Sequence, residues 1–324
     1  MLYPEQNEAR LKLSLDGTWA FALGSCAETQ FDPAKAPCRT PSPSRYLPAT
    51  TTRTTRPPPC AATTAGLWYQ RKVTLPAFCA GQRVVLRFGS VTHTAKVWLN
   101  GQLIAQHKGG FTPFEADVTA LLQPGETALL TVACDNRVNH STLPVGNEDG
   151  QLAFFGSDNA GIPSVEAAKR AARTPRTAPT LTFFNYAGIH RPVVLYTTPK
   201  EYIEDVTIVP AVDGTVQYAV KTTGSAPVRV TVLDADGNAV ASAESAEGTI
   251  TIPEVHLWEP RPGTPYLYTL HATCGADVYD QTFGVRSIEV RGTQVLLNGK
   301  PLYFKGFCKH EDFTAHGRGF DPGC

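Results

Sequence analysis

The chain has 324 residues, a length that predicts two or three domains. Its 29 Lys and Arg balance 29 Asp and Glu, so the charge gives no reason to expect nucleic acid or an anionic membrane as a partner. No apolar run reaches the roughly 20 residues of a membrane helix, and the first residues hold no apolar signal core. We therefore expect a soluble, cytoplasmic protein.

The spacing of the cysteines indicates whether a disulfide-stabilised or a zinc-binding protein is to be expected. They are scattered without CxxC pairs, at positions 26, 38, 60, 79, 134, 274, 308 and 324. In a chain of this length the pattern favours reduced thiols over a disulfide framework. Zinc sites usually cluster their ligands, so we expect no metal, and no motif predicts a cofactor.

The first half of the chain carries short runs rich in β-branched and aromatic residues, bounded by Gly, Pro, Asn or Asp. They include LWYQRKVTL, QRVVLRFG, AKVWLNGQLIAQ, TALLTVAC and RPVVLYTTP. Their length and spacing predict an antiparallel β-sandwich. Asn100-Gly101 lies between two such runs and predicts a type I′ hairpin.

A second β-series follows Pro199, with about seven strands in roughly 90 residues, the spacing of an immunoglobulin-like sandwich. The segment DADGNAV predicts a turn between two of these strands. Residues 293–312 then predict a hairpin that turns at Asn298-Gly299, followed by a buried strand from Leu302 to Lys305. A strand of this kind, left without neighbours, would expose its backbone edges.

Several aromatic residues and one histidine could be either structural or functional. Trp19, Trp68 and Trp98 occupy strand positions and are expected in the core, not as sugar platforms. Trp258 lies in a proline-rich turn and is expected to pack as a core or domain contact. His93 alternates with apolar neighbours, which favours a partly buried, satisfied histidine.

Two stretches differ from the rest of the chain. Residues 33–66 contain no acidic residue, Val or Ile, and are dominated by Pro, Thr, Ala and Arg; residues 166–182 are similar. Such segments cannot bury enough apolar area to fold alone. Residues 33–66 fit a flexible loop or a shifted reading frame equally well, whereas residues 166–182 favour a loop.

The order of the motifs LDGTWAF, LWYQRKVTLP, HKGGFTPFEADVT, FFNYAGIHRPVVLYTTP, FGVRSIEV and FKGFCKHEDFTAHGRGFD resembles the β-glucuronidases of glycoside hydrolase family 2. The resemblance implies a mainly β chain: a jelly-roll sandwich at residues 1–199, an immunoglobulin-like sandwich at 200–289, and the first strand of an incomplete (β/α)8 barrel at 290–324. A complete barrel needs about 250 residues.

The resemblance implies retaining hydrolysis of β-D-glucuronides by two glutamates, one acting as acid/base and one as nucleophile. The family acid/base lies in an Asn-Glu-Pro sequence. Here Asn-Glu occurs only at Asn7-Glu8 and Asn147-Glu148, and proline follows neither. We therefore assign no catalytic residue and expect this chain alone to be inactive.

Four residues are candidates for substrate binding. His310, Glu311 and Asp312 follow the first barrel strand, and the resemblance places this histidine at the substrate pocket, where it could donate to sugar hydroxyls. Thr182 stands where the family usually has an aspartate. A threonine hydroxyl carries no charge, so the charge-assisted bond of that aspartate cannot form.

Two further motifs favour structural roles. In FNYAGIHRPV, Asn185, Tyr186 and His190 are expected to tie the jelly roll to the barrel, and Gly188 allows a tight turn. In GGFTPFEADVT we expect a turn at the two glycines and packing of the two phenylalanines. Glu115 and Asp117 are expected to bond to backbone or arginine partners.

The resulting hypothesis is an amino-terminal portion of a β-glucuronidase, with a β-D-glucuronide or another glycan as its partner. A homo-oligomer is considered only for a full-length protein. The alternatives are a carbohydrate-binding pair of β-sandwiches and a non-functional product of a damaged gene.

Overall fold

A computed structural model of the protein describes residues 2–24, 66–135, 141, 143 and 188–308. The chain divides into two compact units. Of the described residues, one unit comprises 13–24, 66–80, 85–135, 141, 143 and 188–195, and the other comprises 2–12, 81–84 and 196–308. Within the described ranges, no helix is long and apolar enough to cross a membrane.

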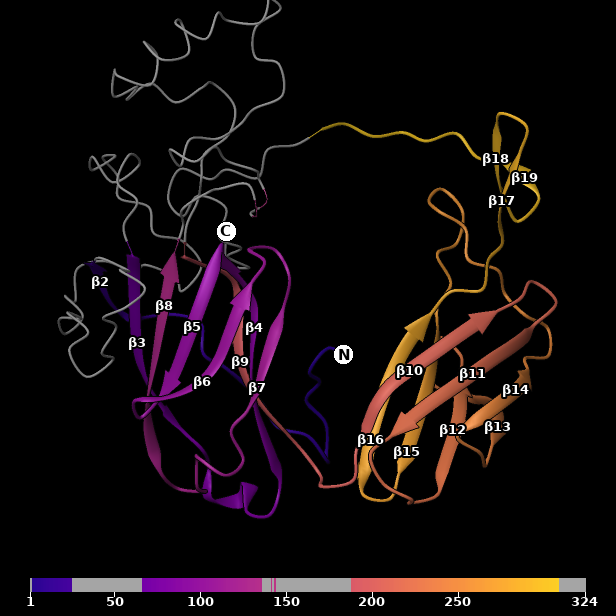
Figure 1. Ribbon diagram of the computed structural model, residues 1–324. Helices are drawn as coiled ribbons and strands as arrows, with labels where there is room; N and C mark the ends of the chain where they lie inside the picture. Colours follow the sequence, from indigo (N-terminus) through magenta and orange to yellow (C-terminus); the bar gives the residue numbers. More distant parts are fainter. Residues whose placement is uncertain (1, 25–65, 136–140, 142, 144–187, 309–324) are drawn as a thin grey trace, which may run out of the picture. The chain divides into compact units, whose positions relative to one another are not determined.

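The first sandwich consists of two sheets, seen as two layers in Figure 1. One sheet has the order β1-β9-β4-β7, with bounds Lys12–Ser14, Gly188–Thr198, Arg83–Thr92 and Phe114–Asp117. The other has the order β2-β3-β8-β5-β6, with bounds Ala20–Gly24, Gly66–Thr74, Thr127–Asp135, Thr94–Leu99 and Gln102–Lys108. A short 3-10 helix, Ala77–Cys79, follows β3.

Aromatic residues pack the core of this sandwich. Trp68 and Trp98 are stacked with ring centroids 6.2 Å apart, and Trp19 meets the edge of Tyr69 at 6.4 Å. The three tryptophans are at most 7% exposed, which confirms their expected core positions. Phe88 is fully buried in β4. Such large buried rings contribute much of the apolar area that stabilises a sandwich.

The predicted hairpin at Asn100-Gly101 is confirmed. The turn connects β5 to β6, where Leu99 pairs with Gln102. Asn100 has φ of 49° and Gly101 has φ of 85°, the positive values that a type I′ turn requires at both central positions. Asn100 Oδ1 also accepts a hydrogen bond from Leu129 N–H at 2.8 Å, which joins the turn to the next strand.

The second sandwich has three strands in one sheet and four in the other, the seven expected from the sequence. The first sheet has the order β10-β11-β14, with bounds Ile203–Pro210, Thr215–Thr222 and Glu247–Thr251. The second has the order β13-β12-β15-β16, with bounds Ala239–Ala243, Val228–Leu233, Tyr268–Cys274 and Asp277–Phe283. Alternate residues of β11 are buried and exposed, because one face of each sheet covers the core.

A small third sheet follows, with the order β17-β18-β19 and bounds Ile288–Arg291, Gln294–Leu297 and Lys300–Pro301. The predicted turn joins β18 to β19, with φ of 50° at Asn298 and 76° at Gly299. Asn298 Nδ2 donates a hydrogen bond to the carbonyl of Trp258 at 3.1 Å. Trp258 itself is half-buried under the guanidinium of Arg286, 4.7 Å from its ring centre.

The buried strand expected from Leu302 to Lys305 is not formed in this chain. Residues 302–308 have no regular secondary structure, and Tyr303, Phe304 and Phe307 are 82%, 70% and 87% exposed. A strand needs hydrogen-bonded neighbours on at least one side. No sheet of the described residues includes this segment, although Leu302 N–H donates a hydrogen bond to the carbonyl of Val295 at 2.8 Å. Its sequence is that of a buried strand, but its structure is not.

Candidate functional site

The best-defined polar site of the first sandwich surrounds the GGFTP loop between β6 and β7. Gly109 has φ of +144°, a conformation that L side chains rarely adopt. A Cβ atom at Gly110 would lie 2.9 Å from His93 Nδ1 and 3.0 Å from Thr92 Cγ2. Both positions therefore require glycine, one for its backbone angle and one for the close approach to β4. This turn was expected from the sequence.

Hydrogen bonds hold the loop against β4. The hydroxyls of Ser90 and Thr92 both donate to the carbonyl of Gly110, the second at 3.2 Å. Gly109 N–H donates to the carbonyl of His93 at 3.1 Å. Since Ser90, Thr92 and His93 are all at most 2% exposed, these bonds form away from water and fix the loop firmly.

Phe111 was expected to pack, and the structure corrects this. Its side chain is 52% exposed, whereas Phe114 is buried. The Phe111 ring lies 6.2 Å from the ring of His93 and 6.3 Å from that of His190, so it covers two histidines with part of its surface and leaves the rest open. His93, expected to be partly buried, is in fact 2% exposed, because the loop closes over it.

The acidic residues after the loop are engaged in structural contacts, as expected. Glu115 Oε1 accepts a hydrogen bond from Arg87 Nη1 at 2.7 Å across β7 and β4. Asp117 Oδ1 accepts from the backbone N–H and the hydroxyl of Thr119, at 3.0 and 2.6 Å. Both carboxylates stabilise the ends of their strand.

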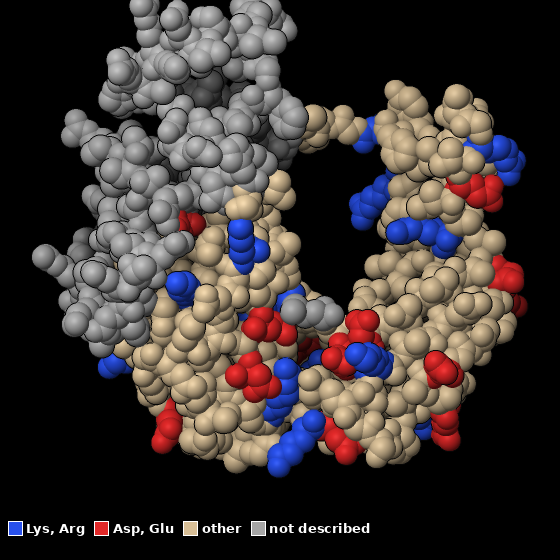
Figure 2. All heavy atoms as spheres, viewed as in Figure 1, with Lys and Arg blue, Asp and Glu red and all other residues tan. Residues whose placement is uncertain are grey.

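The predicted substrate-binding residues Thr182, His310, Glu311 and Asp312 lie outside the described residues, as do Asn185 and Tyr186. Their roles therefore stay predictions. Among the described residues, no group of three or more His, Cys, Asp or Glu could hold a metal ion. On the face shown in Figure 2, the coloured Lys and Arg side chains are interspersed with Asp and Glu.

The described cysteines are free thiols, in agreement with the sequence. Cys79, Cys134 and Cys274 are buried, and Cys308 is exposed. Burial raises the pKa of the Cys79 and Cys274 thiols. A raised pKa lowers the fraction of thiolate, the nucleophilic form, so these two residues act as small core side chains.

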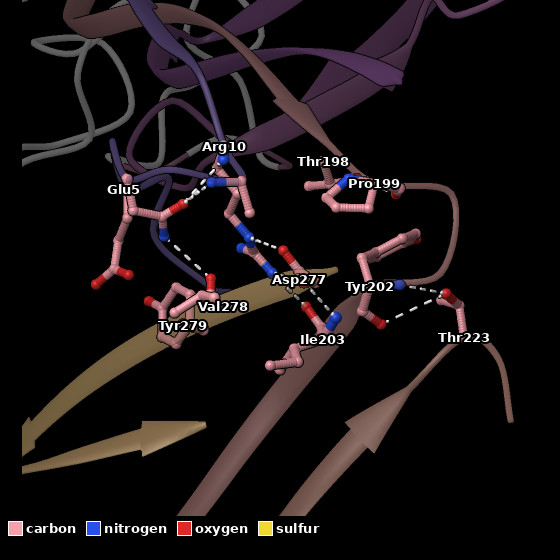
Figure 3. A network of polar contacts seen from close by, with 12 residues as sticks. Glu5, Arg10, Thr198, Pro199, Tyr202, Ile203, Thr223, Asp277, Val278 and Tyr279 are labelled. Atoms are coloured by element: carbon pink, nitrogen blue, oxygen red, sulfur yellow. Dashed lines mark hydrogen bonds and ion pairs between the residues drawn. The ribbon is translucent and has the colours of Figure 1, made fainter. Parts of the chain in front are cut away.

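Sequence reasoning missed a polar network in the second unit (Figure 3). Arg10 and Asp277 form a buried ion pair there, with side chains 4% and 0% exposed. The two residues are separated by 267 positions. No local pattern marks either one, and only the fold reveals the pair.

Three profiles of known protein families match most of the chain. The profile "Glycosyl hydrolases family 2, sugar binding domain" matches residues 45–199. "Glycosyl hydrolases family 2" matches residues 201–286, and "Glycosyl hydrolases family 2, TIM barrel domain" matches residues 288–323. The three matches follow the order of the two sandwiches and the small third sheet.

Curated relatives agree with these profiles. The β-glucuronidases of Canis lupus familiaris and Paenibacillus borealis are each 35% identical to this chain over 99% of its length. The matched regions cover 52% and 53% of those two proteins. The chain thus spans about half the length of the curated relatives that it matches.

Solved structures give the same result. The β-glucuronidase of Faecalibacterium prausnitzii is 86% identical, with a TM-score of 0.86 over 99% of this chain and 54% of that one. A Ruminococcus gnavus β-glucuronidase is 33% identical, with a TM-score of 0.79 over 99% of this chain and 53% of that one. The chain therefore belongs to glycosyl hydrolase family 2, as an amino-terminal portion with the sugar binding domain, the immunoglobulin-like domain and the start of the TIM barrel.

Proposed function

We propose that this chain is the non-catalytic half of a β-glucuronidase-type hydrolase and that, by itself, it does not hydrolyse β-D-glucuronides. The supporting observation is the absence of an Asn-Glu-Pro sequence from its 324 residues, although its family relatives are β-glucuronidases. Glycoside hydrolysis of this type needs two carboxylates flanking the scissile bond. General acid–base help alone contributes typically 10²–10⁴-fold, so losing it together with the nucleophile should abolish turnover.

The test is hydrolysis of p-nitrophenyl β-D-glucuronide by the purified chain. The 86% identical Faecalibacterium prausnitzii enzyme, assayed in parallel, is the matched positive control. We expect release of nitrophenol at the rate of the buffer blank. Release that follows the protein through gel filtration would refute the proposal.

A second candidate function is sugar binding without hydrolysis. It is favoured by the match of residues 45–199 to a sugar binding domain and by the half-exposed ring of Phe111. Ruminococcus gnavus β-glucuronidase has been solved with uronic isofagomine and with D-glucaro-d-lactam, which makes a uronic acid sugar the natural probe. Calorimetric titration with glucuronate distinguishes this function, since saturable heat supports it. A chain that is unfolded by circular dichroism supports the non-functional product instead.

For substrate contacts we propose His310, Glu311 and Asp312 at the start of the barrel, and Thr182 in the place of the family aspartate. Thr182→Asp should then tighten glucuronate binding, because a carboxylate accepts stronger hydrogen bonds from sugar hydroxyls than a threonine does. Thr180→Asp adds the same charge two residues away and is the matched control. Equal glucuronate affinities of the two variants would refute a role of Thr182 in sugar binding.

The domain division proposed here is 1–199, 200–289 and 290–324, and the proposed location is the cytoplasm. Support for the location comes from the four described cysteines, all free thiols, since disulfides persist mainly in oxidising compartments. We propose no nucleic-acid or membrane partner, and a homo-oligomer only for a full-length protein. Mass spectrometry of the chain before and after alkylation tests whether all eight thiols are reduced.

A further inference from the structure

The amino-terminal segment belongs structurally to the second sandwich, although almost 190 residues separate the two in sequence. Residues 2–12, here called the strap, group with the unit that contains β10 to β16. The contacts of the strap are concentrated on β16 (Figure 3). This strand is an edge strand, because it ends the sheet order β13-β12-β15-β16.

Side chains of the strap form hydrogen bonds with backbone groups on this edge of β16. Asn7 Nδ2 donates to the carbonyl of Val278 at 3.0 Å, and Asp280 N–H donates to Glu5 Oε2 at 3.1 Å. Residues two apart on a strand direct their free backbone groups to the same side. The strap therefore satisfies successive groups on the open edge of β16, which would otherwise be available to another strand.

The ion pair of Arg10 and Asp277 fastens the strap at the start of β16. Arg10 Nε donates to Asp277 Oδ1 at 2.8 Å, and Arg10 Nη2 lies 2.5 Å from Oδ2. Arg10 Nη2 also donates to the carbonyl of Ile203 at 3.1 Å, while Ile203 N–H donates to Asp277 Oδ2 at 2.7 Å. Both carboxylate oxygens are thus bonded, and the carboxylate has no access to water.

A local turn in the strap positions the side chain of Arg10. Asn7 Oδ1 accepts hydrogen bonds from Ala9 N–H at 2.9 Å and Arg10 N–H at 2.8 Å, which forms a tight local turn. The guanidinium of Arg10 then lies 5.1 Å from the centre of the Tyr279 ring. Tyr279 in turn donates its hydroxyl to the carbonyl of Tyr3 at 3.2 Å. Contacts at both ends of the strap therefore support one bound position.

We propose that the strap is a closing device for the second sandwich: Arg10 locks it to Asp277, and the locked strap keeps the edge of β16 from pairing with a second copy of the chain. A buried carboxylate that loses the cation paired with it strongly destabilises its surroundings. A sandwich with an open edge strand tends to associate edge to edge. The strap both pairs the buried carboxylate and covers the edge strand.

The test is Arg10→Met in the full chain, with Arg291→Met as the matched control. Arg291 is paired with Glu289 at 3.0 Å but is 74% exposed in its side chain, so its loss should have little effect. The readout is thiol labelling of Cys274, which is fully buried and lies three residues before Asp277. Mass spectrometry resolves its peptide from those of the other cysteines. We expect Arg10→Met to raise its labelling rate about 100-fold or more, and Arg291→Met to leave it unchanged.

A second variant keeps the proposal testable if Arg10→Met does not fold. In Arg10→Met with Asp277→Asn the buried charge is gone, and the amide oxygen still accepts from Ile203 N–H. We expect Cys274 to be labelled at least about 10-fold more slowly in this double variant than in Arg10→Met. If Cys274 is labelled at the same rate in both variants, or if neither variant folds, the proposal that Arg10 locks the strap to Asp277 is refuted.

Self-association tests the second part of the proposal. Sedimentation velocity of Arg10→Met should show concentration-dependent association that Arg291→Met does not show. If Cys274 becomes accessible but the chain stays as it was in sedimentation, the strap does not guard the edge and the proposal fails.

Discussion

Replacing Asn298 should loosen the β18–β19 hairpin from the loop that carries Trp258. The Asn298 side chain accepts a hydrogen bond from Ser287 N–H at 3.0 Å and donates one to the carbonyl of Trp258 at 3.1 Å. Its φ of 50° lies in the left-handed region, which asparagine tolerates better than most residues. The residue therefore contributes both a backbone conformation and a two-sided contact.

The expected magnitudes differ between two replacements. Each hydrogen bond contributes about 1 kcal/mol, and a left-handed conformation costs alanine roughly 1 kcal/mol more than glycine. Asn298→Ala should therefore lose about 3 kcal/mol, which increases local opening roughly 100-fold. Asn298→Gly loses only the two side-chain bonds, about 2 kcal/mol, and should increase opening roughly 30-fold.

The assay is hydrogen exchange of the backbone amide of residue 298, which donates to the carbonyl of Ser287 at 3.0 Å. Asn100→Ala is the matched control, because Asn100 has φ of 49° in an equivalent Asn-Gly turn of the first sandwich. It should leave the exchange of residue 298 unchanged. Exchange in Asn298→Gly that equals the unmodified chain, or exceeds that of Asn298→Ala, would refute the reasoning.

Three further outcomes are expected. Burial raises the pKa of Glu5, so its contribution to stability is fully present below the unfolded pKa and is lost as pH rises through the folded value. Glu5→Gln should thus be the more stable form in urea at pH 7 but not at pH 3, and the opposite order contradicts this. Phe88→Ala removes a fully buried ring stacked on Phe114 at 4.9 Å and should lower the free energy of unfolding by about 3–5 kcal/mol in urea titration; a loss below about 1 kcal/mol would contradict it. Maleimide should label exposed Cys308 within seconds and buried Cys274 only on unfolding, and equal rates would disprove their assigned environments.

Local features of the sequence were sufficient for the two Asn-Gly turns, for the core tryptophans and for the family. A type I′ turn depends on two adjacent residues that accept positive φ, so Asn100-Gly101 and Asn298-Gly299 could be identified without any partner. Large aromatic residues in apolar, strand-forming runs favour the core. Trp68 and Trp98 are buried within strands, and Trp19 is buried just before β2. The motif order predicted the family that the profiles then matched.

The candidate site was predicted less completely. The two glycines of the GGFTP loop and the partners of Glu115 and Asp117 were expected, since both depend on short-range geometry. The exposure of Phe111 was not expected, because it depends on how far the loop covers two histidines from distant parts of the chain. The four predicted substrate contacts lie outside the described residues and remain predictions.

Only the tertiary structure decided the contacts between residues far apart in the chain. The apolar sequence from Leu302 to Lys305 predicts a strand, yet strand formation depends on a hydrogen-bonding neighbour that the residue pattern does not specify. Arg10 and Asp277 show the same limit, since nothing near either residue indicates a partner 267 positions away. Periodicity and turn chemistry are local properties of the backbone, whereas a buried ion pair or a covered edge exists only once the whole sandwich has formed.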